Sequence, residues 1–380
     1  MEFVRLGVIG LGNMGGSHIR QTIPKVLRVK VGAVCDTVAE RLAAFPDVPH
    51  FLNASDLIKS GLVDAVLIAT PHYDHTTIGI EALNAGLHVL VEKPISVHKA
   101  DCERLIAAHN GTSVFAAMFN QRTDPHYQMI RNLVQSGELG EIRRINWIIT
   151  NWFRTASYYA SGGWRATWGG EGGGVLLNQC PHNLDLYQWI FGMPSRVRAF
   201  CQLGKFHEIE VEDSVTAYLE HPNGATGVFV TTTGEAPGTN RLEVAGDRGK
   251  LVFEDGKIRF TRTTRSVADF CATSSDLFST PPVWNCEIPV QGDGDQHVGI
   301  LRNFIEAILD GKTLIAPAQE GIHSVELANA FLYSSFKGST VEIPIDPAAY
   351  QSHLSSLVKN STHKKVVLET IAENMAESVK

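Results

Sequence analysis

Five short apolar runs recur at regular spacing through the first 120 residues, and each is followed by a segment with helical periodicity. The runs are RLGVIG (5–10), VKVGAVC (29–35), DAVLIAT (64–70), HVLVE (88–92) and SVFAAM (113–118). Continuous apolar strands that alternate with helices are typical of a parallel sheet covered on both faces. The first part of the chain is therefore predicted to be an α/β domain.

The first apolar run leads directly into a glycine turn. The stretch GLGNMG carries Gly10, Gly12 and Gly15 at GxGxxG spacing, with Asn13 and Met14 between the last two. In a dinucleotide site these glycines permit the tight turn, the approach of the pyrophosphate and the close packing of helix on strand. The N–H groups that open the helix then face the phosphates. The pattern alone fits a plain turn equally well, but its place between a strand and a helix favours cofactor binding.

The second strand ends at Asp36, which follows Gly10 by 26 residues. An acid about 20 residues beyond the glycine turn typically binds the adenosine ribose. Its carboxylate would repel the 2′-phosphate of NADP, and no arginine directly follows it. The sequence predicts NAD as the cofactor, a preference that Arg41 would weaken if it folded back to the site.

The stretch ATPHYDHT follows the third long run. Ligands of open α/β sheets bind outside the carboxyl ends of the strands, so Thr70, Pro71 and His75 are candidate cofactor contacts. His72 is expected to lie in a surface loop. Two interpretations of His75 stay open, because it could cap the next helix or line the cofactor site.

The fourth run ends on a charged pair, Glu92 and Lys93, which Pro94 follows. A solvated pair at a strand end is one interpretation, in which Pro94 only ends the pairing. A lysine beside a nicotinamide would instead stabilise the alkoxide that develops during hydride transfer. Pro94 restricts Lys93 to extended backbone angles. We therefore expect Lys93 to be catalytic and Glu92 to lie in the cofactor site.

The stretches GVIGLGNMG, ATPHYDH and VEKPIS resemble, in order and spacing, the glucose-fructose oxidoreductase/inositol dehydrogenase/rhizopine-catabolism (Gfo/Idh/MocA) family. Later stretches extend the resemblance to about residue 345: GELGEIRRI, GGGVLLNQCPHNLDL, VEDSVTAYLEHPNGATG, EVAGDRGKLVFEDG and NFIEAILDGK. The resemblance implies a Rossmann domain that binds NAD, a catalytic role for Lys93 and a cis bond between Lys93 and Pro94. It also implies a large, mostly antiparallel sheet that covers the active site and joins subunits into a homodimer or homotetramer.

The pattern of the sequence changes near residue 121. Beyond it, polar and apolar residues alternate in VTAYLEH, TGVFVTTT, LEVAG and KLVFED, which is typical of an antiparallel sheet with one covered face. The 380 residues also exceed the size of one core. We predict an NAD-binding Rossmann domain over 1–121 and a substrate-binding and oligomerisation domain of the α+β class over 122–380. The last stretch, 362–380, is expected to form an amphipathic helix.

The stretch GGWRATWGGEGGGVLLNQCPHNLDLYQWIFG holds the most candidate residues. A helix is predicted from about 180 to 191, because Pro181 suits its first turn and Gly192 its end. His182 and Asp185 share a face of that helix, so Asp185 is expected to hold one imidazole nitrogen and leave the other for the substrate. His182 is predicted to relay a proton, and a buried structural histidine is the alternative.

In the family that this stretch resembles, an acid four residues before the histidine joins the histidine and the lysine in catalysis. Asn178 occupies that position here. An asparagine can orient a hydroxyl but cannot take a proton, so the proton is expected to pass through His182 alone. This departure from the inositol dehydrogenases leaves the substrate open.

Aromatic and basic residues surround the glycine run. Aromatic faces beside polar groups fit a sugar, whose C–H faces stack on rings while its hydroxyls form hydrogen bonds. Packing at a loop-rich edge is the alternative. The candidate substrate contacts are Lys93, Asn120, Arg122, Trp152, Arg154, Trp164, Asn178 and His182, with Phe153 and Trp168 in the same aromatic set and Arg165 assigned to the cofactor.

Composition excludes several other classes of protein. The formal net charge of -7, without a block of like charge, argues against nucleic acid as a partner. No apolar run reaches the roughly 18 residues of a membrane span, and no signal-peptide pattern is visible, so a cytoplasmic protein is expected. The six cysteines lack CxxC spacing, so no metal site is expected.

These features predict an NAD-dependent dehydrogenase that oxidises a secondary hydroxyl of a pyranose sugar, a glycoside or a cyclic polyol. Two alternatives stay open. One is a glycoside hydrolase that uses NAD for transient oxidation and elimination, from which net NADH formation would distinguish the dehydrogenase. The other is a cofactor-sensing regulator, which would be expected to lack the lysine or the histidine.

Overall fold

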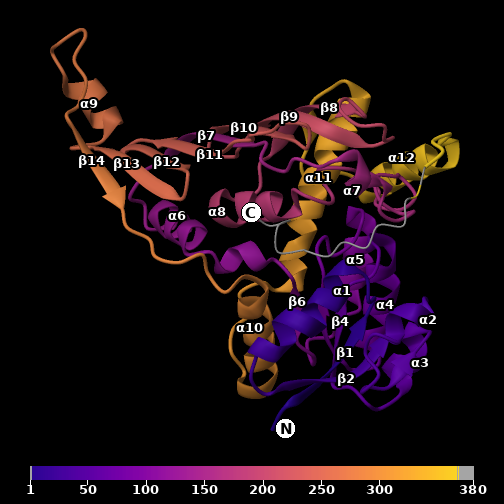
Figure 1. Ribbon diagram of the computed structural model, residues 1–380. Coiled ribbons are helices and arrows are strands. Elements are labelled where there is room, and N and C mark those ends of the chain that lie inside the picture. The colour runs from indigo at the N-terminus through magenta and orange to yellow at the C-terminus, as the bar shows by residue number, and fades with distance from the viewer. Residues whose placement is uncertain (1, 366, 368–380) are drawn as a thin grey trace.

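The computed structural model, which describes residues 2–365 and 367, is built around two β-sheets (Figure 1). The first sheet has the strand order β3-β2-β1-β4-β5-β6, and all its pairs are parallel. In this order the strand sequence reverses between β1 and β4, where α/β sheets bind their ligands. The strands are β1 (Val4–Ile9), β2 (Val29–Cys35), β3 (His50–Phe51), β4 (Ala65–Ile68), β5 (His88–Val91) and β6 (Phe115–Ala117).

Short helices connect these strands, as the alternating pattern predicted. The five predicted runs form β1, β2, β4, β5 and β6, whereas the two-residue β3 is too short to leave a pattern in the sequence. The helical segments are α1 (Asn13–Ser17) with η1 (His18–Thr22) and η2 (Ile23–Lys25), α2 (Ala39–Leu42), α3 (Ala54–Lys59), α4 (His72–Asn84) and α5 (Lys99–Ala107).

The second sheet has nine strands in the order β14-β13-β12-β11-β7-β10-β9-β8-β15. Its pairs are antiparallel except for β7 and β10, which are parallel. The predicted two-part architecture is therefore confirmed. The strands are β7 (Ile142–Ile149), β8 (Arg196–Leu203), β9 (Glu212–Glu220), β10 (Thr226–Thr232), β11 (Asn240–Gly246), β12 (Gly249–Glu254), β13 (Lys257–Thr263), β14 (Val283–Ile288) and β15 (Val341–Glu342).

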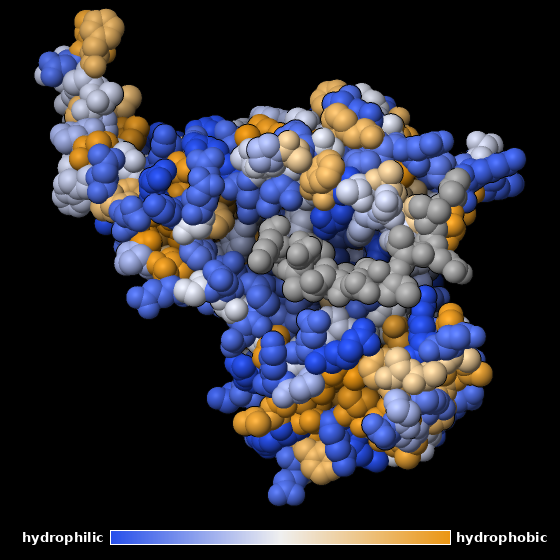
Figure 2. All heavy atoms as spheres, viewed as in Figure 1, coloured by the Kyte–Doolittle hydropathy of each residue, from blue (hydrophilic) through white to orange (hydrophobic). Residues whose placement is uncertain are grey.

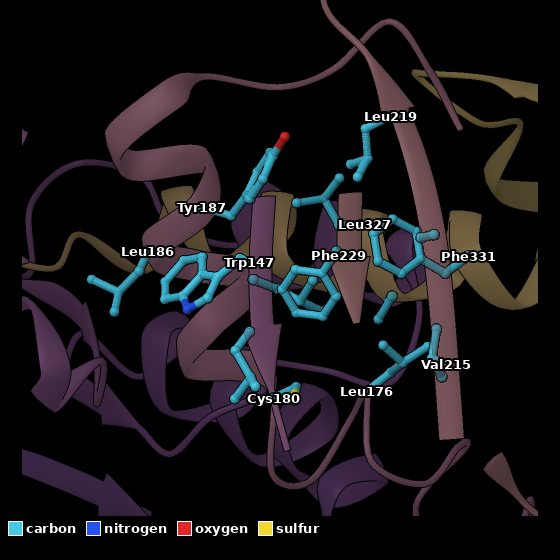
Figure 3. Packing of buried hydrophobic residues seen from close by; sticks show 14 of the residues in the cluster. Trp147, Leu176, Cys180, Leu186, Tyr187, Val215, Leu219, Phe229, Leu327 and Phe331 are labelled. Atoms are coloured by element: carbon cyan, nitrogen blue, oxygen red, sulfur yellow. The ribbon is translucent and has the colours of Figure 1, made fainter. Parts of the chain in front are cut away.

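Helices cover one face of the second sheet, and the core lies between them and the strands. Phe229 of β10 packs against Phe331 of α11 at a ring distance of 5.8 Å and against Trp147 of β7 at 6.4 Å (Figure 3). The remaining helical segments are η3 (Asn120–Thr123), α6 (Pro125–Gln135), α7 (Ala156–Ala160), α8 (Pro181–Phe191), α9 (Val267–Thr273), α10 (Gln296–Asp310), η4 (Ala318–Glu320), α11 (Gly321–Lys337) and α12 (Pro347–Asn360).

The helix α10 returns from the second sheet to the first domain. Its apolar side chains join the hydrophobic cluster around the parallel sheet, as Ile300, Leu301, Phe304 and Ile305 are buried among the residues of β1, β4 and β5. In Figure 1, α10 lies beside the parallel sheet and away from the large sheet. The parallel sheet therefore takes part of its core from a segment far beyond residue 121, and the predicted boundary stays a prediction.

A hairpin arm projects from one end of the second sheet (Figure 1). It is formed by β13, α9, β14 and the loops between them, and its tip is apolar (Figure 2). Leu277 and Phe278 in that tip are 90% and 96% exposed. The sequence pattern did not predict this arm.

The predicted helix over 362–380 falls mostly on residues outside the described part of the chain. Of that stretch, residues 362–365 and 367 are described, and they carry no helix. Within the described residues, no helix is long and apolar enough to cross a membrane.

Candidate functional site

The glycine turn after β1 is shaped as a dinucleotide site requires. Gly10 has a φ of 90°, and a Cβ there would lie 2.6 Å from the carbonyl oxygen of Ala69. A Cβ on Gly15 would lie 1.8 Å from the carbonyl oxygen of Gly10. A Cβ on Gly12 would meet nothing within 4 Å, so the backbone there borders open space. The turn thus fits a pyrophosphate over Gly12, with Asn13 and Met14 opening the helix beyond it.

Asp36 lies beside this turn at the end of β2. Its carboxylate accepts hydrogen bonds from the backbone N–H groups of Leu11, at 2.7 Å, and Val38, at 2.9 Å. Arg41 does fold back, because its Nη1 lies 3.4 Å from Oδ2 of Asp36. The arginine side chain remains half exposed. Its charge offsets part of the repulsion that Asp36 would exert on a 2′-phosphate.

We expect NAD to bind at least about tenfold more tightly than NADP, since about 1.4 kcal/mol of repulsion from Asp36 gives that ratio. Fluorescence titration with NADH and NADPH measures the two affinities. Asp36→Ser should reduce the ratio, whereas Arg41→Ala should increase it by removing the attraction for the phosphate. Equal affinities of the unaltered chain for the two cofactors would contradict the prediction.

The first of the two histidines after β4, His72, does not lie where the sequence placed it. α4 begins at His72 with Pro71 as its N-cap, so neither histidine is in a loop, and His72 is buried. Burial, followed by the charges of His75 and Lys93, lowers the pKa of His72 well below its usual value. The expected surface position of His72 is therefore wrong, because the loop before α8 covers it: its Nδ1 lies 3.4 Å from the carbonyl oxygen of Glu171.

His75 joins two of the loops at the carboxyl edge of the sheet. Its Nδ1 lies 2.8 Å from the carbonyl oxygen of Pro94, and its Nε2 lies 2.9 Å from that of Thr70. It does not cap α4, because it lies in the first turn and its ring nitrogens bond elsewhere. A place lining the cofactor site stays a prediction for His75, Thr70 and Pro71.

Lys93 leaves the end of β5 and reaches the segment before α8. Its Nζ donates a hydrogen bond of 2.8 Å to the backbone carbonyl oxygen of Asn178. Burial lowers the pKa of Lys93, and the negative charge of Glu92 partly opposes that shift. The bond between Lys93 and Pro94 is cis, as predicted.

Glu92 is buried beneath Lys93 and paired with a histidine that no sequence motif singled out. Its Oε1 lies 2.7 Å from Nε2 of His18, and its Oε2 accepts the backbone N–H of Lys93 at 3.2 Å. Burial alone would raise the pKa of Glu92. The hydrogen bond from His18 and the charge of His18 outweigh burial and lower the pKa of Glu92 to about 2. Glu92 therefore stays ionised and orients the lysine loop.

A second histidine, His297 at the start of α10, packs against His18 at a ring distance of 5.4 Å. Burial, and then the charge of His18, lowers the pKa of His297 to about 4. His18 carries a weak signal in the sequence, since it follows the glycine turn by three residues. His297 carries none, because only the return of α10 to the first domain brings it here.

His182 lies in the first turn of α8, which ends at Gly192 as predicted. The side chain is buried, and its Nδ1 has no hydrogen-bond partner among the described residues. Burial, and then the positive charge of Lys93, lowers the pKa of His182 well below its usual value. The ring is thus neutral near pH 7, and the hydrogen-bonding capacity of its Nδ1 is unused among the described residues.

The predicted contact between Asp185 and His182 is wrong. Asp185 instead binds Arg122 in a bidentate ion pair, with N–O distances of 2.6 Å and 2.7 Å. Both side chains are 1% exposed. An arginine offers two N–H groups to a carboxylate and competes better for it than a neutral imidazole on the same helix. The spacing of the two residues on the helix could not reveal this competitor.

Neither of the candidate residues from the domain crossing faces open surface. Besides Asp185, Arg122 bonds Glu320 at 2.5 Å and the carbonyl oxygen of Ile315 at 3.2 Å. These contacts occupy most of its N–H donors and give it a structural position, and the substrate contact of Arg122 stays a prediction. The Nδ2 of Asn120 donates to Gln296 at 2.8 Å, while its Oδ1 is buried without a partner among the described residues.

Asn178 is held by a polar cluster. Its Nδ2 donates to Glu171, and its Oδ1 accepts from the hydroxyl of Tyr158 at 3.1 Å. The same hydroxyl accepts from Nη1 of Arg165 at 3.0 Å. Tyr158 and Glu171 were missed, because neither belongs to a motif whose spacing predicts a contact.

The basic and aromatic candidates lie around Tyr158. The guanidinium of Arg165 is 4.7 Å from the ring centres of both Tyr158 and Trp164, and that of Arg154 is 5.1 Å from Tyr158. Trp152 is buried, and its Nε1 donates to Asn183 at 3.1 Å. Arg154 and Arg165 are close enough for their charges to lower the pKa of Lys93. The structure thus brings Lys93, Asn178, Arg154 and Arg165 together.

Within the described residues, no group of three or more His, Cys, Asp or Glu side chains is arranged to hold a metal ion. All six cysteines are free thiols.

Two family models match the chain. One is described as "Oxidoreductase family, NAD-binding Rossmann fold" and matches residues 4–121. The other is described as "GFO/IDH/MocA C-terminal domain" and matches residues 127–252.

Among curated proteins, inositol 2-dehydrogenase 2 of Paenarthrobacter aurescens is 32% identical over 366 residues, which cover 89% of this chain and 97% of that protein. Inositol 2-dehydrogenase of Salmonella typhimurium is 35% identical over 145 residues, and this match covers 36% of this chain and only 43% of that enzyme.

Solved structures share the fold. The WlbA dehydrogenase of Bordetella pertussis, in complex with NADH and UDP-GlcNAcA, has a TM-score of 0.75 at 24% identity, covering 90% of this chain and 100% of that one. A levoglucosan dehydrogenase in complex with NADH has a TM-score of 0.74 at 20% identity, with the same coverage of 90% and 100%.

Proposed function

The chain belongs to the Gfo/Idh/MocA family of NAD-binding oxidoreductases, and from this premise we propose that it oxidises a secondary hydroxyl of a pyranose sugar, a glycoside or a cyclic polyol. The observation that carries the proposal is the position of Lys93. Its ammonium group leaves the carboxyl edge of the parallel sheet and reaches the backbone carbonyl of Asn178. Asn178 lies three residues before α8, the helix that carries His182. A cation and a neutral imidazole thus come from different domains to the edge where the glycine turn lies.

Each residue has a distinct part in the proposed reaction. The glycine turn and Asp36 would hold NAD, which would supply the hydride acceptor for the carbinol carbon. The ammonium of Lys93 stabilises the negative charge that develops on the substrate oxygen. His182, which is neutral because burial lowers its pKa, accepts the proton of the hydroxyl. Asn178 holds the ammonium through its carbonyl oxygen and takes no proton.

The surroundings of Lys93 support a polyhydroxylated substrate. The rings of Tyr158 and Trp164 and the guanidinium groups of Arg154 and Arg165 place flat apolar faces beside hydrogen-bond donors. The names of two similar proteins, an inositol 2-dehydrogenase and a levoglucosan dehydrogenase, refer to a cyclic polyol and a sugar. These names agree with a polyhydroxylated substrate for this chain.

A screen of sugars, glycosides and cyclic polyols for NADH absorbance tests the proposal with the purified chain. We expect at least one compound to give stoichiometric NADH. Cleavage of a glycoside without net NADH would instead favour the hydrolase, and NAD binding without turnover on any compound would favour the regulator.

We also propose a homodimer or homotetramer formed through the uncovered face of the second sheet. Ile148, Phe200 and Tyr218 are exposed on strands of that sheet, an apolar set that would be covered in an assembly. Light scattering of the purified chain measures the assembly, and a monomer at micromolar concentration would contradict the proposal.

A further inference from the structure

Glu171 is a buried carboxylate close to Lys93 that no sequence motif singled out. It is 2% exposed, and its Oε2 accepts the backbone N–H of Ala166 at 2.6 Å. Its Oε1 accepts the Nδ2 group of Asn178. The nearest cationic nitrogen, Nη1 of Arg165, is 3.9 Å away and beyond hydrogen-bond distance. Two neutral amide groups therefore hold this carboxylate in place.

The neighbours of Asn178 leave only one orientation for its amide. Its Oδ1 faces two donors, the hydroxyl of Tyr158 at 3.1 Å and Nε2 of Gln179 at 3.2 Å. Its Nδ2 faces the carboxylate of Glu171, which only accepts. A reversed amide would lose all three contacts, so Glu171 fixes the position of Asn178.

Asn178 in turn fixes two polar groups of the site. Its backbone carbonyl accepts Nζ of Lys93 at 2.8 Å, and its side-chain carbonyl accepts the hydroxyl of Tyr158. A displacement of Asn178 would move both groups relative to a substrate. Displacements of this kind cost rate steeply, because a shift of about 1 Å can cost about 10²-fold.

We propose that Glu171 is a positioning residue of the dehydrogenase, which acts through Asn178 to hold Lys93 and Tyr158 in their working geometry. This inference rests on the proposed function, since it requires Lys93 to act on the substrate oxygen. Glu171 does not touch the reacting atoms itself.

The charge of Glu171 also acts on Lys93. Burial lowers the pKa of the lysine, and the carboxylates of Glu92 and Glu171 oppose that shift. Burial likewise raises the pKa of Glu171, whereas Arg165 and Lys365 lower it. The other ionisable groups that face Glu171 are His72, through its bond to the Glu171 carbonyl oxygen, the buried Glu212, and Tyr159.

These charges determine the direction in which the pH profile should move. Without the carboxylate at position 171, the pKa of Lys93 falls further. Since the ammonium form stabilises the alkoxide, activity should then be lost at a lower pH on the alkaline side of the profile.

Three variants test the inference. Glu171→Gln has one acceptor oxygen for two donors, so it must lose the hydrogen bond from either the Ala166 N–H or the Asn178 amide. Asn178→Asp places two carboxylates in contact. The double variant Glu171→Gln/Asn178→Asp restores every bond, because the new glutamine accepts from Ala166 and donates to the new aspartate, which still accepts from Tyr158 and Gln179. The exposed Glu208→Gln is the matched control.

Each single variant should lower kcat by about 10-fold to 10²-fold, the range expected for misplacement of a reacting group. The KM for NAD should stay unchanged. For Glu171→Gln the alkaline limb of the pH profile of kcat should also move to lower pH. The double variant should recover most of the lost kcat, and its alkaline limb should return to the pH seen in the unaltered chain. Glu208→Gln should match the unaltered chain.

Two results would overturn the inference: an unchanged kcat and pH profile in folded Glu171→Gln, or a double variant no more active than Asn178→Asp. If the single variants do not fold, the kcat of the double variant is the test: a kcat near that of the unaltered chain supports the inference, and a kcat lowered by about 10-fold or more contradicts it. Failure of the proposed function would look different, since Lys93→Ala would then retain its activity.

Discussion

Replacing Lys93 by alanine should lower kcat by about 10²–10³-fold or more, because the loss of one preorganised charge-stabilising donor typically costs that much. Its Nζ is the cation that reaches the segment before α8, at 2.8 Å from the carbonyl of Asn178. The affinity for NAD should change little, since the glycine turn and Asp36 remain intact. NADH formation on the identified substrate measures kcat, and fluorescence titration measures cofactor binding.

Asn178→Ala is the matched comparison for this variant. It removes the amide but keeps the backbone carbonyl that accepts Lys93, so its loss of kcat should be smaller than that of Lys93→Ala. Near-normal turnover of Lys93→Ala would leave the lysine with no part in the chemistry, and the proposed reaction would need another group to stabilise the alkoxide.

Replacing Arg122 by alanine should lower the free energy of unfolding by about 3–5 kcal/mol, the usual cost of breaking a buried ion pair from one side. Arg122 and Asp185 are each 1% exposed, so the variant would leave a carboxylate buried without its cation. Urea denaturation followed by circular dichroism measures the change.

The exposed pair of Arg28 and Asp310 provides the control for this stability prediction. Its side chains are 44% and 38% exposed, so Arg28→Ala should cost no more than about 1 kcal/mol. Replacing both Arg122 and Asp185 by apolar residues of similar size should cost less than Arg122→Ala, because no charge is then left unpaired. Equal denaturation midpoints for Arg122→Ala and Arg28→Ala would contradict the prediction.

The sequence was sufficient for five of the six strands of the parallel sheet and for its glycine turn, since local patterns determine them. Gly10 and Gly15 are required where a Cβ would clash with backbone atoms, and the apolar runs became strands because both of their faces are covered. Lys93 was found for a similar reason, because any residue after β5 must lie at the carboxyl edge of the sheet.

The errors and omissions share a physical cause, which is competition from residues far away in the chain. Asp185 is on the correct face to bind His182, but Arg122, 63 residues earlier, binds it instead. His72 was expected at the surface because the segment around Glu171 that covers it lies 99 residues further on. His297 and Tyr158 could not be placed at all without the fold.

The return of α10 to the parallel sheet affects how the chain can be made. On a ribosome the strands from β1 to β6 emerge first, but Ile300, Leu301, Phe304 and Ile305 complete their hydrophobic cluster. Domains usually fold as units in the order of synthesis, yet the hydrophobic cluster of this one lacks the four α10 side chains until most of the polypeptide has been translated. We therefore expect its nucleotide-binding half to complete its folding together with the rest of the molecule, and not ahead of it.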